Sequence, residues 1–142
     1  MSTDENKALV RRFFALGPSR GDLRAAGELL ANDFALHVPL PCSPGVQGMK
    51  EVINTCRAAF EHLDVTVEDM VAEGDKVAAR FTARGIHKGA FMGLPATGKS
   101  ITMTGIEVFR IENGKIADLW GEANLLGLMQ QLGIQPPLGE QG

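Results

Sequence analysis

Four stretches of alternating apolar and polar residues constrain the fold of this chain most strongly. They run over residues 65–72, 76–87, 100–112 and 115–123, and such alternation is typical of strands that bury one face. The segments EGDK (73–76) and ENGK (112–115) are short enough to join the strands in pairs as tight hairpins. The second half of the chain is therefore predicted to form a long antiparallel meander.

The rest of the chain has a helical pattern. Ser2 and Glu5 form a capping box before a first helix that is predicted to stop at Gly17-Pro18. The stripe that contains Cys56 lies on a third helix, and we interpret this cysteine as core packing. The pattern predicts, in order, a second helix at 22–30, a short strand at 34–38, the third helix at 49–63 and a last short helix at 125–132.

Three helices, a strand and a meander describe an α+β domain in which a curved antiparallel sheet wraps around helices and encloses a pocket. A single domain is predicted for residues 1–135, and residues 136–142 are predicted to be a flexible tail.

The segment GLPATGKS (93–100) matches the phosphate-binding pattern G-x-x-x-x-G-K-[ST]. That motif needs a helix after its lysine, whereas Ser100 begins an alternating strand. Pro95 also lacks one of the N–H donors that would face a phosphate. We therefore expect no nucleotide binding and interpret the segment as a loop between strands.

Charge and composition narrow the class of partner. A net charge of −3 gives no electrostatic basis for binding nucleic acid or an anionic membrane. No apolar run approaches membrane-spanning length, and the polar start does not resemble a signal peptide. Two cysteines and three widely spaced histidines predict neither a disulfide framework nor a metal site. A cytoplasmic protein without metal or cofactor fits these features.

Glu107 is the most informative candidate residue. Alternation places it on the largely apolar inner face of strand 100–112, between Gly105 and Phe109. A carboxyl there loses hydration, so its pKa is expected to rise toward the value that a general acid or base needs. A structural glutamate with a buried partner is the equally weighted alternative.

The other candidates surround this position. His37, His87 and Asn124 could steer substrate oxygens, although both histidines also fit a partly exposed rim of the pocket. The absence of tyrosine removes the phenol that ketosteroid-isomerase-like sites use. Nine residues are predicted to contact a flat hydrophobic ligand: Phe13, Phe14, Phe60, Phe81, Phe91, Met92, Met103, Leu119 and Gly121.

The order of elements resembles the NTF2-like superfamily, whose domains are cones. The segments at 21–34, 67–99 and 105–133 are similar to the SnoaL-like polyketide cyclase family. The resemblance implies an essential aspartate in the last strand and a pocket histidine in the preceding one. Here these positions hold Gly121 and Glu107, so the acid has moved to the neighbouring strand or the chemistry is absent. Glu122 and Asn124 are nearby substitutes if a bulge alters the register of the last strand, which would turn Glu122 rather than Gly121 inward.

The resemblance favours a small-molecule protein that performs cofactor-independent acid/base chemistry on a hydrophobic, oxygenated, polyketide-like substrate. Cyclisation or isomerisation would follow proton abstraction next to a carbonyl. A non-catalytic ligand-binding or accessory protein and an epoxide-type hydrolase are the alternatives. We also expect a homodimer through the outer face of the sheet, where Ile106, Val108 and Trp120 lie.

Overall fold

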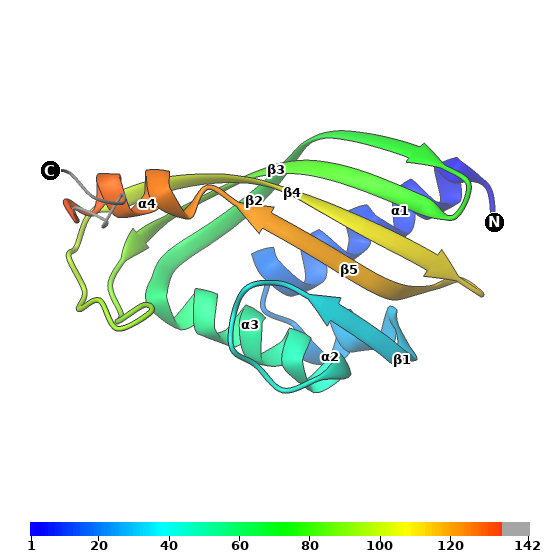
Figure 1. The fold of residues 1–142 in the computed structure, drawn as a ribbon, viewed down its shortest axis with the longest axis horizontal. Coiled ribbons are helices and arrows are strands. Elements are labelled where there is room, and N and C mark those ends of the chain that lie inside the picture. The colour runs from blue at the N-terminus through cyan, green and yellow to red at the C-terminus, as the bar shows by residue number, and fades with distance from the viewer. Residues whose placement is uncertain (135–142) are drawn as a thin grey trace, which may run out of the picture.

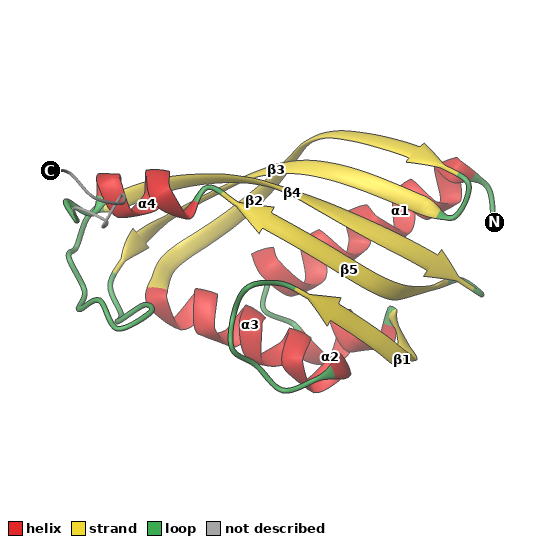
Figure 2. Cartoon of the chain, viewed as in Figure 1, coloured by secondary structure: helices red, strands yellow, loops and turns green. Residues whose placement is uncertain are grey.

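The computed structural model describes residues 1–134, and these form a layer of helices against a five-stranded sheet (Figures 1 and 2). The predicted tail at 136–142 and the predicted domain boundary at 135 lie outside the described residues. The elements are α1 (Thr3–Phe14), η1 (Ala15–Ser19), α2 (Leu23–Glu28), β1 (Leu30–His37), α3 (Gly45–Ala59), β2 (Phe60–Glu73), β3 (Lys76–His87), β4 (Ser100–Glu112), β5 (Lys115–Ala123) and α4 (Leu125–Gln131).

The predicted meander is confirmed. The sheet has the order β1-β5-β4-β3-β2, and the four strands β2 to β5 pair antiparallel. Asn113 and Gly114 both have positive φ angles, 52° and 74°, between the paired residues Glu112 and Lys115. That geometry matches the right-handed twist of the flanking strands, which is why Asn-Gly closes this hairpin tightly.

The edge strand β1 differs from the prediction of a wholly antiparallel sheet. It begins at Leu30, earlier than expected, and runs parallel to β5, with Leu36 opposite Leu119 and His37 opposite Trp120. A parallel partner needs a long crossover, and α3 with the whole meander supplies it. The sheet is therefore mixed.

The first helix begins as predicted but ends differently. Ser2 Oγ accepts from the Glu5 N–H at 3.1 Å, and Glu5 Oε1 accepts from the Ser2 N–H at 2.9 Å, which completes the capping box. Beyond Phe14 the helix widens into the π-helical turn η1 around Pro18. Proline has no N–H for the ordinary helical hydrogen bond, so the chain closes a wider turn instead of stopping.

The third helix begins and ends earlier in the chain than its apolar stripe predicts. It ends at Ala59, and Phe60 already has extended backbone and pairs with His87 in β3. The apolar stripe continues past the helix because Phe60 and Leu63 line the same interior from β2. Periodicity alone does not mark such a change of element.

The core lies between α1, α3 and the inner face of the sheet. Phe13 and Phe14 of α1 meet Phe109 of β4 edge-on, at centroid distances of 5.9 and 5.6 Å. Most of the predicted inner residues of β3 and β4 are buried, including Val77, Ala79 and Phe109. Figure 1 shows α1 and α3 on one side of the sheet and the β3–β4 connection beyond one end of α3.

Candidate active site

A cavity of about 150 Å³, partly open to solvent, lies between α3 and the inner face of the sheet. Its wall is almost entirely apolar. Lining residues come from the end of α1, η1, the loop after β1, α3, all four strands of the meander, the β3–β4 connection and the start of α4: Phe14, Pro18, Val38, Pro39, Leu40, Met49, Val52, Ile53, Cys56, Phe60, Leu63, Val65, Phe81, Ala83, Phe91, Ile101, Met103, Glu107, Gly121, Glu122, Ala123 and Leu125.

Glu107 brings a carboxyl to this wall, as the alternation predicts. It lies on β4 directly opposite Gly121 on β5. A Cβ atom at Gly121 would lie 3.2 Å from Glu107 Oε2 and 3.1 Å from a methyl group of Val38. The carboxyl thus fills space that a side chain at position 121 would need. An acid from β4 occupies the place where the resemblance implies an acid from β5.

The surroundings of this carboxyl favour its neutral form. Glu107 is half-buried, with its remaining surface on the cavity. Burial raises its pKa from 4.5 to about 7, and no hydrogen bond or ion pair from the described residues offsets that effect. The structural alternative, a glutamate satisfied by a buried partner, has no such partner within residues 1–134. A carboxyl that titrates near neutral pH can both accept and return a proton.

Cys56 faces the same cavity from α3. Burial, with a smaller contribution from the negative charge of Glu107, raises the pKa of its thiol to about 11, so the group stays neutral at physiological pH. The helical stripe predicts only that Cys56 is buried. Its place opposite the sheet follows from how α3 crosses the inner face, which the local pattern does not encode.

The loop of residues 38–44 forms another part of the wall. Glu51 holds it from α3, accepting from the N–H and the hydroxyl of Ser43 at 2.8 and 2.7 Å. These two hydrogen bonds lower the pKa of Glu51. A Cβ at Gly48 would lie 1.8 Å from the Ser43 carbonyl oxygen, so glycine is required for this close approach.

The sequence analysis does not predict that Val38, Pro39 and Leu40 line the site. The feature of the sequence that could have indicated them is the proline-rich loop directly after a strand.

His87 anchors the β3–β4 connection and does not line the cavity. It is fully buried, its Nδ1 accepts from the Thr97 N–H at 3.3 Å, and its Nε2 has no hydrogen-bond partner among the described residues. Its ring packs at 5.5 Å from Phe60, which in turn packs at 5.1 Å from Phe91. His87 therefore holds the loop whose Phe91 reaches the cavity wall, and the predicted rim position is wrong.

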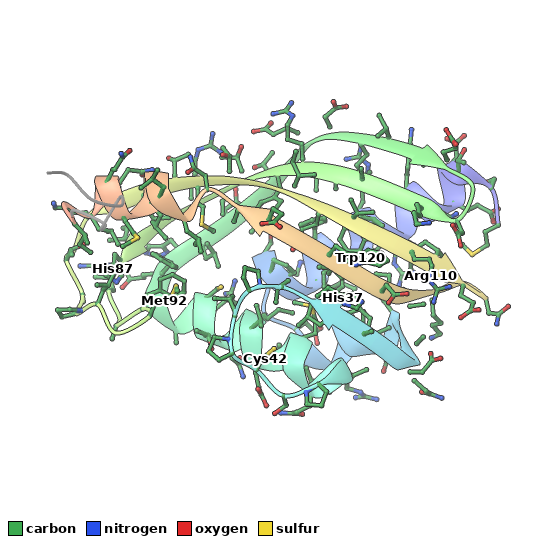
Figure 3. The ribbon with its side chains drawn as sticks, viewed as in Figure 1. His37, Cys42, His87, Met92, Arg110 and Trp120 are labelled. Carbon is green, nitrogen blue, oxygen red and sulfur yellow. The ribbon has the colours of Figure 1, made fainter. Side chains whose placement is uncertain are left out.

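His37 lies on the outer face of the sheet rather than at the pocket. Its ring stacks on Trp120 at 5.0 Å, and its Nε2 lies 3.0 Å from Asp118 Oδ1. Arg110 donates to the other oxygen of that carboxylate at 2.6 Å. These contacts lower the pKa of Asp118, with the hydrogen bond from His37 as the largest cause. Figure 3 shows this group at the opposite end of the sheet from His87 and Met92.

The structure sorts the remaining predicted contacts into two groups. Phe14, Phe60, Phe81, Phe91, Met103 and Gly121 line the cavity together with Glu107. The others do not: Phe13 and Leu119 are fully buried in the core, Met92 is 57% exposed, and Asn124 caps α4 by accepting from the Gly127 N–H. Alternation identifies which residues point inward but not whether they meet packed side chains or the cavity. Core and cavity residues therefore look alike in the sequence.

The pairing register of β5 with β4 shows whether Gly121 or Glu122 faces the inside of the cone. The irregularity between β4 and β5 lies near Ala117, between the pairs Arg110–Asp118 and Ile111–Ile116. Beyond it the ladder is regular, so Gly121 faces inward and the exposed Glu122 pairs with Ile106 on the outer face.

The segment that matches a phosphate-binding motif is a loop, and Ser100 begins β4. Within residues 1–134 there is no cluster of three metal-ligating side chains. No helix in the described part of the chain is long and apolar enough to cross a membrane.

Helices on a curved sheet, with an apolar cavity between them and the carboxyl of Glu107 on its wall, define an NTF2-like cone. The model of the SnoaL-like polyketide cyclase family matches residues 8–132, and the chain belongs to this family.

Several solved structures are similar over nearly the whole chain. TsrD from Streptomyces laurentii is 34% identical, with a TM-score of 0.85 over 95% of this chain and 99% of the other. AclR from Streptomyces galilaeus, a proposed hydroxylase, is 29% identical, with a TM-score of 0.84 over 95% and 100%. IdmH from Streptomyces antibioticus, a proposed polyketide cyclase, is 31% identical, with a TM-score of 0.79 over 91% and 99%. No curated protein matches the chain.

Proposed function

We propose that this protein catalyses proton transfer on a neutral, apolar, oxygen-containing small molecule, with Glu107 as the base that removes a proton next to a carbonyl. The resulting enolate would close a ring or shift a double bond. The protonated carboxyl would then return the proton to product, so the step needs no cofactor. The relationship to proposed polyketide cyclases supports a polyketide-like substrate.

The observation that carries the proposal is the carboxyl of Glu107 on the wall of an apolar cavity. A glutamate with a pKa of about 7 is about half ionised at neutral pH. It is also a stronger base than a solvated carboxylate, and water around the reacting atoms is limited by the apolar wall. A purely structural cone has no need of an unpaired acid beside a void.

The alternatives have less support. An epoxide-type hydrolase needs a cluster of polar groups to hold its water, whereas Glu107 and Cys56 are the polar side chains that face this cavity within residues 1–134. A non-catalytic binding protein would use the same cavity, and only an activity measurement separates it from an enzyme.

The test is exchange of carbon-bound protons with deuterated water, followed by proton NMR at neutral pH. A panel of one-ring and two-ring ketones, including 1,3-diketones, would be incubated with wild-type protein, Glu107→Gln and the control Glu73→Gln, whose exposed side chain lies outside the cavity lining. We expect acceleration by the wild type and by the control, and a loss of roughly two to four orders of magnitude in Glu107→Gln. Equal acceleration by Glu107→Gln would reject Glu107 as the base. No acceleration with any compound would favour the binding protein.

A further inference from the structure

The charge at the cavity wall is unbalanced. Two of the lining residues of the described chain are acidic, Glu107 and Glu122, and none is lysine, arginine or histidine. Glu122 is exposed on the outer-face register, so Glu107 is the acid that points inward. When this carboxyl ionises, no cationic side chain of residues 1–134 lines the cavity to compensate its charge.

The remainder of the wall suits the body of an organic cation. Phe14, Phe60, Phe81 and Phe91 all line the cavity. The faces of aromatic rings attract cations, and more strongly where water is excluded. Apolar cavities of about this volume hold a molecule the size of benzene. A single ring that carries a positively charged group therefore matches both the size and the polarity of the space.

We propose that the cavity binds single-ring organic ammonium ions, with the ammonium paired to the Glu107 carboxylate and the ring among the phenylalanines. The proposal goes beyond acid/base chemistry on a neutral substrate and does not depend on it. Such an ion supplies the partner that the folded chain does not give Glu107. It would also compete with any neutral substrate for the same space.

The binding must depend on pH in a defined direction. The groups that share the wall with Glu107 are the neutral Cys56 thiol of α3 and the outward Glu122 of β5; no other titratable side chain of the described residues lines the cavity. A carboxyl with a pKa of about 7 is about nine-tenths ionised at pH 8 and one-tenth at pH 6. The affinity for an ammonium ion should therefore be about tenfold higher at pH 8. At pH 6, binding should release about one proton.

Benzylamine and benzyl alcohol form a matched pair of probes, because they share a ring and differ in charge. Isothermal titration calorimetry would measure both at pH 6 and pH 8, in two buffers of different ionisation enthalpy so that released protons are counted. The proteins are the wild type, Glu107→Gln and the control Glu73→Gln, an exposed acid that does not line the cavity, with circular dichroism to verify folding. We expect the wild type at pH 8 to bind benzylamine about tenfold or more tightly than benzyl alcohol. Glu107→Gln should lose this preference, and Glu73→Gln should keep it.

Equal affinities for the two probes, an amine affinity that Glu107→Gln leaves unchanged, or no binding of benzylamine at millimolar concentration would each overturn the proposal. The pH dependence in the wild type tests it even if Glu107→Gln fails to fold. Ketone exchange that depends on Glu107 without amine binding would reject this inference alone. Amine binding without any exchange would reject the proposed function alone.

Discussion

Replacing Glu107 with glutamine should make the protein more stable, by an amount that grows with pH. Glutamine has nearly the same shape as a protonated glutamate but cannot ionise. Burial raises the pKa of Glu107 from 4.5 to about 7. Because the pKa is raised on folding, the wild type has its full stability below about pH 4.5 and loses part of it as pH rises through 7. The shift of about 2.5 pKa units corresponds to about 3 kcal/mol.

Urea unfolding of wild type and Glu107→Gln at intervals from pH 4.5 to pH 8.5 measures this difference, because all other ionisations occur in both proteins. The gap between the two free energies of unfolding should widen by about 3 kcal/mol over that range and become level above pH 7.5. The difference between the two urea midpoints should then change by an amount on the order of 1 M. Glu73→Gln, at an exposed position outside the cavity lining, serves as the control and should not show this widening. A constant gap for Glu107→Gln would mean that its carboxyl is as well solvated in the folded chain as in the unfolded one.

Three further predictions concern other parts of the chain. Lys99→Ala should leave folding and benzylamine affinity unchanged, and neither protein should bind ATP with magnesium in equilibrium dialysis; micromolar binding lost in the variant would contradict this. We propose that two copies pair through the outer face of the sheet, where Ile106 is 52% and Trp120 37% exposed beside Val108. Sedimentation should show a dimer at tens of micromolar that Ile106→Glu converts to a monomer, and a wild-type monomer would refute it. Gly121→Ala should cost about 1–3 kcal/mol in urea unfolding, because its Cβ would lie 3.1 Å from Val38 and 3.2 Å from Glu107 Oε2; an unchanged midpoint would show that the two side chains move aside freely.

The strands, and which of their residues point to each face of the sheet, could be predicted from the sequence because both are local properties. Alternation sets which residues share a face, and two-residue turns fix the register of a hairpin. The inward Glu107 and its partner Gly121 follow from these rules. The parallel edge strand β1 does not, because its pairing with β5 joins residues far apart in the chain.

The site could be predicted only in part. Phe13 and Phe14 are neighbours on one helix, yet only Phe14 of the two lines the cavity, whereas Phe13 is fully buried in the core. His37 lies opposite Trp120 on the outer face because β1 joins the far edge of the sheet. The helical stripe predicts only core packing for Cys56, because such a stripe does not show whether it meets side chains or a void. Which of these candidates line the cavity depends on how deeply each side chain is buried and on its tertiary contacts, rather than on residue type.

Glu107 can act as the proposed base only if its carboxyl titrates near neutral pH in the folded protein, and we claim that it does. Carbon-13 NMR of glutamate-labelled protein, with Glu107→Gln to assign the resonance, follows this carboxyl directly without knowledge of a substrate. The structure predicts a midpoint of about 7. A midpoint near 4.5, the value for a solvated glutamate, would contradict the claim and remove the physical basis for Glu107 as the base.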